Sequence, residues 1–499
     1  MSKPPERDIR IEKLVKLREQ GIDPYPTRSF ADYDIAELFE KFEKFAESEE
    51  PVQIAGRMVA FRSHGGSSFA HIQDRTGKIQ LYFRKNIVGA DKYKLLKMID
   101  IGDFLNITGV LFTTRTGEQT VGVKDFTLIS KSIMPLPEKW HGLQDEDLKV
   151  RYRYLDTIMD PDVKSRFETR SRIISAIRRH LDEKGFIEVE TPVLQPLYGG
   201  ASARPFTTHH NTMEMKLYMR IAIELYLKRL IIGGLEKVYE IGKIFRNEGI
   251  DRFHNPEFTM LELYEAYSDY HGMMELAENL LNAIAEYLDM GNKVQYNEIE
   301  STLKAPFKRI GFFESIDEYA GIDARYATDD ELRSHLKSKN VDMAPDANRG
   351  QLLDEVFSEF VEPNLIDPTF VMDYPVILSP LAKRKPDDEA IVERFELFWF
   401  GMEIANAFTE LNDPIDQRQR FEEQMSYRAK GDPEAQVLDE DFLEAMEHGM
   451  PPTGGIGFGI DRITMIFTDT YSLRDILLFP LTRPKLEAEA EAEEEAKKE

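Results

Sequence analysis

The stretch from residue 237 to residue 267 places the strongest constraint on how this chain can fold. Two β-rich runs flank a polar loop that contains Gly249, Asp251, Asn255 and Pro256. Because glycine, asparagine and proline interrupt strands, the pattern predicts two antiparallel strands joined by a long connection. We expect the chemistry of the protein at this loop.

Alternation along the two runs predicts which side chains meet. Successive side chains of a strand point to opposite faces, so Phe258, Glu262 and Tyr264 share one face of the second run. Burial alone does not favour polar groups beside an aromatic ring unless the face opens onto a ligand. Arg246 and Glu248 lie beside the loop at the end of the first run. An arginine fork and an aromatic platform suit a nucleotide, and a charged surface hairpin is the simpler alternative.

A longer match separates these alternatives. The segments FRNE at 245–248 and HNPEFT at 254–259 resemble motif 2 of the class II aminoacyl-tRNA synthetases, in the form carried by the lysyl enzymes. An Arg-x-Glu pattern alone would leave the surface hairpin ahead, but the length of the match argues against a chance agreement.

Two further segments resemble the remaining class II motifs. A predicted helix over 162–184 leads into a strand that ends at Pro192, as in motif 1, through which these synthetases dimerise. The run GGIGFGIDR at 454–462 resembles motif 3, a glycine-rich strand that enters a helix with Arg462 at its positive end. The resemblance covers residues from about 7 to 484 and implies a homodimer.

A hairpin is predicted over 393–410, with a tight turn at 400–401. In this register Glu396 faces Ala405, and Glu396 and Glu403 are diagonal neighbours on one side. Carboxylates this close repel each other, and hard oxygen ligands beside a triphosphate favour Mg²⁺. Two exposed glutamates would be the alternative without motif 2.

The same hairpin contains a conflict of alternation. Strict alternation from Glu403 sends Asn406, Phe408 and Glu410 to the opposite face, whereas the family has all of them in its site. A bulge inserts one extra residue and re-aims the side chains that follow, so we expect a bulge at 404–405.

The resemblance implies the activity of the lysyl enzymes, in which lysine is activated with ATP and then transferred to the 3′ end of tRNA(Lys). It places Arg246, Glu248, Arg252, His254, Asn255, Phe258 and Arg462 at ATP. It places Gly200, Glu224, Arg246, Glu262, Tyr264, Asn406, Phe408 and Glu410 at lysine. Glu396 and Glu403 would hold Mg²⁺, and Arg246 and Arg462 would be the catalytic residues.

The chain departs from the family in the motif 2 loop. Phe253 stands where many bacterial lysyl enzymes have arginine, and Arg252 lies one residue earlier. In a regular strand this shift would turn the arginine to the other face. Because the loop is not expected to be a regular strand, we predict that Arg252 still reaches the outer phosphates, with Phe253 beneath the loop.

Short strands separated by turn residues are predicted before the class II motifs, over 52–60, 68–73, 78–83, 104–112 and 121–129. Five such strands suit an OB-fold, a barrel that commonly binds single-stranded nucleic acid. Phe69, considered alone, is a core residue. The resemblance to the anticodon-binding barrel of the lysyl enzymes instead assigns Phe69, Gln80 and Glu118 to the anticodon.

The predicted fold class is α+β and multidomain, with an N-terminal OB-fold barrel and a class II catalytic domain built on an antiparallel sheet. The predicted segments are a helical segment at 1–50, the barrel at 51–135, a linker at 136–150, the catalytic domain at 151–484 with a helical insertion at about 270–364, and an acidic disordered tail at 485–499.

Composition limits how the protein can bind tRNA, which covalent or metal sites it can have, and where in the cell we expect it. The net charge of −26, from 64 basic and 90 acidic residues, argues against a globally basic surface, so contact with tRNA must be local. The absence of cysteine excludes disulfides and thiolate zinc sites. We expect a cytoplasmic protein without a membrane span, because no apolar run is long enough and the N-terminus is too polar for a signal peptide.

Three other functions were weighed. An aspartyl or asparaginyl enzyme shares the barrel and the motifs, but Glu262, Tyr264 and Glu410 suit an ammonium better than an anion. A relative that modifies a protein lysine lacks the barrel. A catalytically dead relative would be expected to have lost one of the arginines or glutamates named above.

Overall fold

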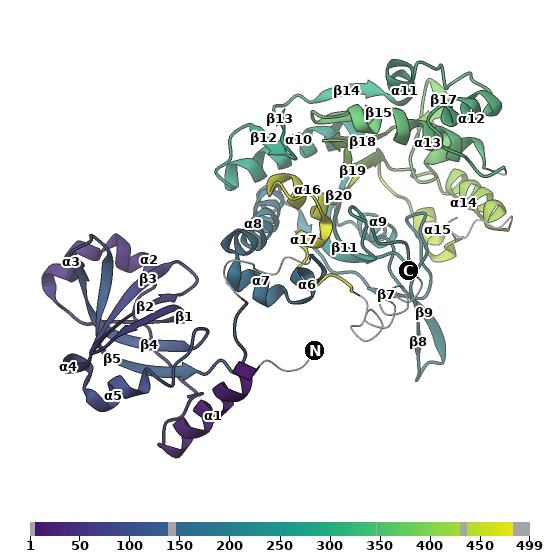
Figure 1. Cartoon of the computed structure of the whole chain (residues 1–499). Helices are drawn as coiled ribbons and strands as arrows, with labels where there is room; N and C mark the ends of the chain where they lie inside the picture. Colours follow the sequence, from purple (N-terminus) through teal and green to yellow (C-terminus); the bar gives the residue numbers. More distant parts are fainter. Residues whose placement is uncertain (1–4, 138–145, 346, 430–436, 483–499) are drawn as a thin grey trace, which may run out of the picture. The chain divides into compact units, whose positions relative to one another are not determined.

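The computed structural model describes residues 5–137, 146–345, 347–429 and 437–482. The predicted acidic tail and much of the predicted linker lie outside the described residues. The chain divides into two compact units, Met1–Gln144 and Asp145–Glu499 (Figure 1). Among the described residues, no helix combines the length and the apolar character that a membrane crossing requires.

The first unit is a closed five-stranded barrel with the strand order β1-β2-β3-β5-β4. Its strands are β1 (Val52–His64), β2 (Ser67–Gln73), β3 (Lys78–Arg84), β4 (Phe104–Thr113) and β5 (Gln119–Ser130). Its helices are α1 (Pro5–Glu19), α2 (Ile35–Glu40), α3 (Phe42–Ser48), α4 (Lys85–Val88) and α5 (Ala90–Leu95). Burial alternates along β3, so Ile79, Leu81 and Phe83 fill the barrel core.

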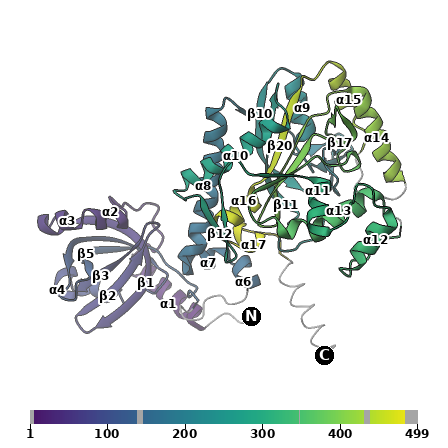
Figure 2. The same cartoon turned by 90° about the horizontal axis from the view of Figure 1, so that it is seen from above.

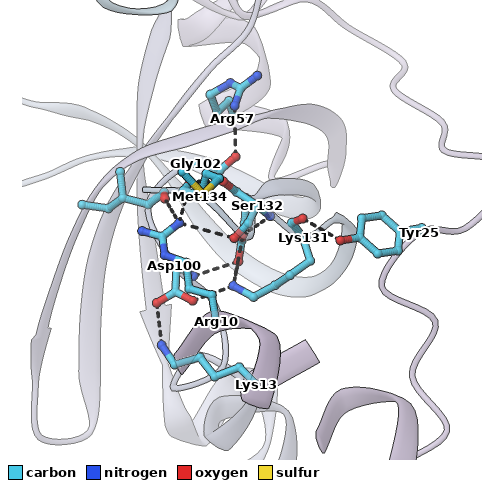
Figure 3. Close-up of polar contacts among 11 residues, drawn as sticks. Arg10, Lys13, Tyr25, Arg57, Asp100, Gly102, Lys131, Ser132 and Met134 are labelled. Atoms are coloured by element: carbon cyan, nitrogen blue, oxygen red, sulfur yellow. Dashed lines mark hydrogen bonds and ion pairs between the residues drawn. The ribbon is translucent and has the colours of Figure 1, made fainter. Parts of the chain in front are cut away.

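A buried polar network fixes α1 to one end of this barrel (Figure 3). The Arg10 guanidinium donates to the backbone carbonyls of Ile101 at 3.0 Å and Met134 at 3.3 Å. Lys131, whose side chain is fully buried, donates to the Asp103 carboxylate at 2.8 Å. Lys131 is paired with carboxylates and Arg10 has carbonyl acceptors, which is what makes the burial of these two charges tolerable.

The second unit contains an eight-stranded sheet with the order β14-β15-β18-β19-β20-β11-β10-β6. In that order the strands are Lys308–Gly311, Thr369–Met372, Arg394–Trp399, Met402–Thr409, Thr453–Gly459, Glu257–Ala266, Lys237–Phe245 and Ile187–Glu188. Neighbouring strands are antiparallel except for the pairs β14–β15 and β10–β6. The barrel and this sheet confirm the predicted fold class.

Smaller strands accompany the main sheet: β7 (Leu194–Gln195), β8 (Thr207–His210), β9 (Met215–Met219), β12 (Lys293–Tyr296), β13 (Ile299–Thr302), β16 (Arg384–Lys385) and β17 (Asp388–Val392). The helices are α6 (Glu146–Arg151), α7 (Arg153–Met159), α8 (Pro161–Glu183), α9 (Glu224–Ile232), α10 (Tyr270–Tyr287), α11 (Phe312–Ala320), α12 (Asp329–Lys337), α13 (Arg349–Phe360), α14 (Pro414–Ala429), α15 (Glu440–Glu447), α16 (Ile460–Phe467) and α17 (Leu473–Ile476). Two short 3₁₀ turns cover Glu362–Asn364 and Val376–Leu378.

One face of the main sheet is covered by a helical core (Figure 2). Helices α8, α10 and α16 pack there against Leu261 and Leu263 of β11. Alternation then turns Phe258, Glu262 and Tyr264 to the opposite face, as the sequence predicts.

The segment at 270–364 differs from its prediction as a purely helical insertion. It contains the hairpin β12–β13, and its strand β14 pairs with β15 at the edge of the main sheet. These strands have four residues each and many polar side chains, so they carry too little alternation to be recognised from the sequence.

The hairpin of β18 and β19 confirms the predicted turn and bulge, and it corrects one pairing. Phe398 faces Glu403, but Glu396 faces Asn406 and not Ala405. The register shifts at this point, which leaves Ile404 as the extra residue.

Candidate functional site

A cavity of about 730 Å³ lies in the second unit, on the face of the sheet opposite the helical core. The predicted site residues that line it are Gly200, Glu224, Arg246, Glu248, His254, Asn255, Phe258, Glu262, Tyr264, Glu396, Glu403, Asn406, Phe408 and Arg462. Arg252 and Glu410 do not line it. The cavity therefore unites residues from motif 2, motif 3 and the hairpin.

Arg246 and Phe258 form one wall. The guanidinium carbon of Arg246 lies 5.2 Å from the centre of the Phe258 ring. Burial lowers the pKa of Arg246, against the opposing charges of Glu248 and Glu403, but an arginine keeps its proton. The wall therefore offers a permanent cation for an anionic group beside a flat surface on which a ring can stack.

One end of the cavity is acidic. Glu262 is buried, and it accepts hydrogen bonds from the backbone N–H of Ile223 at 3.2 Å and the hydroxyl of Tyr264 at 3.3 Å. Burial, together with the nearby charge of Glu224, raises the pKa of Glu262 to about 7. Carboxylates held this close in a buried place suit a ligand that carries ammonium groups.

Glu410 lies behind this acidic end. Its carboxylate pairs with Lys228, a fully buried lysine whose ammonium also donates to Glu224 at 2.5 Å. Sequence reasoning missed Lys228, although its spacing four residues after Glu224 on a helix was a usable signal.

Glu396 and Glu403 lie at the other side of the cavity. Glu396 accepts from the Tyr374 hydroxyl at 2.8 Å and pairs with Arg394, and Glu403 lies 3.4 Å from the Arg462 guanidinium. Burial, and the neighbouring charge of Glu403, raise the pKa of Glu396 to about 7. Within the described ranges, no group of three or more His, Cys, Asp or Glu side chains could hold a metal ion by itself.

Several lining residues had no prediction. Arg394 precedes Glu396 by two residues on β18, so alternation could have placed it on the same face. Asn348 and Asp354 come from α13 and its N-cap, in the segment where the sequence showed no motif. Nothing in their local pattern indicates a site.

The motif 2 loop places Arg252 away from the cavity. The guanidinium carbon of Arg252 lies 3.4 Å from the centre of the Tyr471 ring, and its backbone carbonyl accepts from Leu473 N–H at 3.0 Å. Phe253 lines the cavity and packs against the helical core. The position of Phe253 agrees with its prediction, whereas Arg252 does not point at the cavity in this structure.

A second candidate surface lies on the barrel. The Phe69 ring stacks on the Tyr82 ring, with centres 4.6 Å apart and planes 19° apart, and neither ring is buried in the core. Gln80 accepts from the Thr120 hydroxyl at 2.9 Å, and Glu118 lies 3.1 Å from the His71 ring nitrogen. Phe69 and Gln80 thus lie on the paired strands β2 and β3, and Glu118 directly precedes β5, the other neighbour of β3.

Comparisons with known proteins identify the families that the two units resemble. Residues 145–483 match the family model described as tRNA synthetases class II (D, K and N), and residues 52–135 match the model described as OB-fold nucleic acid binding domain. Three similar curated proteins are named lysine–tRNA ligase. They come from Thermoanaerobacter pseudethanolicus (53% identical, 96% of each chain), Carboxydothermus hydrogenoformans (51% identical, 96% of this chain and 98% of the relative) and Moorella thermoacetica (52% identical, 96% and 98%).

Proposed function

Because the chain belongs to the class II tRNA synthetases, we propose that it is a lysine–tRNA ligase, which activates lysine with ATP and transfers it to tRNA. The observation that carries this proposal is that a single cavity combines a cationic and aromatic wall with a cluster of buried carboxylates. Arg246 and Phe258 suit a nucleotide, and the buried carboxylates of Glu224 and Glu262 suit an amino acid with a second ammonium group.

In the first step the lysine carboxylate attacks the α-phosphate of ATP, a P–O bond forms, and pyrophosphate leaves. The carboxylate is already ionised, so no general base is needed. Catalysis then depends on orientation and on charge stabilisation, which Arg246 supplies at the α-phosphate and the lysine carboxylate. In the second step the 3′-end hydroxyl of tRNA takes the lysyl group, and AMP leaves.

The remaining ATP contacts follow from the cavity. Phe258 stacks on the adenine, while His254 and Arg462 hold the outer phosphates. Glu396 and Glu403 fit Mg²⁺, since they are two mutually repelling carboxylates that supply hard oxygen ligands, and phosphate and water would complete the shell. Bound Mg²⁺ would neutralise phosphate charge.

The barrel is proposed to bind the anticodon of tRNA(Lys). The Phe69 ring, stacked on Tyr82 and partly exposed on the barrel surface, is a platform for one unpaired base. Gln80 and Glu118 supply hydrogen-bonding groups for base edges beside it. The protein is proposed to act in the cytoplasm, where tRNA is charged.

A homodimer is proposed from an apolar surface near α8. A groove of about 690 Å³ is lined there by Phe167, Ile174 and the segment 476–481. Phe479 is 72% exposed and Leu481 is 63% exposed, although both are large and apolar. Since motif 1 also belongs to this region, a second copy of the chain is the partner that fits.

Charging of tRNA tests the proposed function. Unfractionated tRNA, ATP and Mg²⁺ are incubated with the protein and with labelled lysine, aspartate or asparagine in separate reactions. We expect labelled tRNA with lysine alone. Charging with aspartate or asparagine would instead assign the chain to another branch of its family.

A further inference from the structure

A buried positive charge lies behind the acidic end of the cavity. We propose that Lys228 is a specificity-determining positioning residue, an internal counter-ion that holds Glu224 and Glu410 in place and leaves the pocket with the charge that a doubly cationic amino acid neutralises. This inference rests on the proposed function, because it concerns how lysine is selected.

Lys228 lies behind the pocket wall and not in the cavity. Its side chain is fully buried and does not line the cavity, whereas Glu224 and Phe408 do. The ammonium donates to Glu224 at 2.5 Å, pairs with Glu410, and lies 5.3 Å from the centre of the Phe408 ring. Glu224, Glu410 and Phe408 all belong to the predicted lysine site, so Lys228 contacts three of its residues.

The arrangement leaves room for a ligand at Glu410. Its Oε1 atom is buried and has no hydrogen-bond partner in the described part of the chain. Gly455 separates this oxygen from the cavity, and a side chain there would collide with both Glu410 and Tyr264. Because it has no side chain, Gly455 lets this oxygen, which Lys228 does not engage, lie directly beneath the cavity wall.

The charges around Lys228 explain why one internal cation matters. The charged or titratable groups that face it or its partners are Glu224, Glu262, Tyr264, Arg394 and Glu410. Lys228 faces Glu224 and Glu410, and Glu262 lies close enough to Glu224 to feel its charge, so these three carboxylates and one ammonium carry a formal net charge of −2. Arg394 is paired with Glu396, and Arg246 is the cation that faces Glu262. Lysine brings two ammonium groups, and its carboxylate is left for Arg246.

The pKa shifts of Glu410 and Lys228 also support the role of Lys228 as a counter-ion. Burial raises the pKa of Glu410 well above its usual range, and Lys228 is the group that opposes this rise. Burial acts to lower the pKa of Lys228, but Glu224 and Glu410 outweigh it and the pKa is raised. Without Lys228, one of these carboxyls would take up a proton and lose its attraction for an ammonium.

The test measures lysine-dependent and ATP-dependent pyrophosphate exchange by Lys228→Met and Lys228→Arg. For Lys228→Met we expect the KM for lysine to rise about 100-fold while the KM for ATP stays within about twofold. The rise in the KM for lysine of Lys228→Met over wild type should become smaller as the pH is raised, because the orphaned carboxyl ionises and regains its attraction for an ammonium. Lys228→Arg keeps the charge, so its KM for lysine should stay within about tenfold of wild type.

Lys131→Met is the matched control, because Lys131 is also fully buried and paired with two aspartates, but in the barrel. It should destabilise the protein without changing the KM for lysine. An unchanged KM for lysine in Lys228→Met, an equal rise for lysine and ATP, or a Lys228→Arg defect as large as that of Lys228→Met would overturn the inference. If Lys228→Met does not fold, the Lys228→Arg result decides alone. Wild-type protein without lysine-dependent exchange would contradict the proposed function instead.

Discussion

At the scale of single residues, buried carboxylates dominate the site. Glu224, Glu262 and Glu410 are each less than a tenth exposed, and Lys228 is the buried ammonium that Glu224 and Glu410 share. Buried charges persist only when they are paired or when a ligand completes them. The unpaired oxygen of Glu410 is therefore the buried acceptor for which an ammonium group of the substrate would supply the missing partner.

Replacing Glu410 with glutamine keeps the shape of the side chain and removes its charge. We expect Glu410→Gln to weaken lysine recognition by roughly 2 to 4 kcal/mol, as for the loss of a desolvated charge pair. The measurement is the KM for lysine in pyrophosphate exchange. Glu265→Gln, on the neighbouring part of the sheet in β11 and paired with Lys237, is the control. A normal KM for lysine in Glu410→Gln would remove Glu410 from the lysine site.

Glu262 predicts a pH dependence of lysine binding. Its pKa of about 7 is raised by burial and by Glu224, so the carboxyl is neutral below that pH and anionic above it. Attraction for the ammonium groups of lysine should therefore strengthen as the pH rises through about 7. The KM for lysine, measured at saturating ATP, should fall over this range in wild type, and Glu262→Gln should lose this step. A step that persists in Glu262→Gln belongs to another group.

The residues that could be predicted are those that lie on regular strands or match a motif. Alternation placed Phe258, Glu262 and Tyr264 on one face, and the structure shows them lining one cavity. Local spacing could have placed Lys228 beside Glu224 and Arg394 beside Glu396, but their contacts with the distant residues Glu410 and Tyr374 could not be read from the sequence. Pairing of this kind is decided by tertiary packing, which local pattern does not report.

At the scale of elements, a bulge in β19 determines which of its side chains reach the cavity. Ile404 is the extra residue that re-aims β19, so Asn406 and Phe408 reach the cavity together with Glu403. This bulge could be predicted from a conflict between alternation and motif. Strand β14 could not, because four residues give no usable period.

On the barrel, Phe69→Ala tests the stacking surface. We expect tRNA charging to weaken by about 1 to 3 kcal/mol, the contribution of one stacked base, while lysine-dependent pyrophosphate exchange stays normal. Phe104→Ala on β4 is the control for general damage to the barrel. The centre of the Phe104 ring lies 4.2 Å from the guanidinium carbon of Arg57. A parallel loss of both activities would mean that Phe69 supports the fold and does not bind a base.

At the scale of the whole molecule, the order of parts was predictable and their surfaces were less so. Motifs fix the barrel ahead of the class II sheet, and both are present. The apolar groove around Phe479 carried no signal in the sequence, because it joins α8 to a segment near the end of the catalytic domain. Such a surface exists only once distant segments are packed together.

The proposed homodimer predicts a change in association. Phe479→Asp places a charge in the exposed apolar groove, so the dimer should dissociate to monomers at micromolar concentration. Sedimentation velocity measures the change, with Tyr326→Asp, at another highly exposed aromatic, as the control. A Phe479→Asp variant that sediments as wild type would place the interface elsewhere.

The most direct test of the account is pyrophosphate exchange with each of the twenty amino acids in turn, in the presence of ATP and Mg²⁺. The buried carboxylates around Lys228 predict that lysine alone supports rapid exchange. Amino acids with neutral or acidic side chains leave a buried charge unpaired and should give little exchange. Exchange driven by aspartate, by asparagine or by none of the twenty would contradict the account.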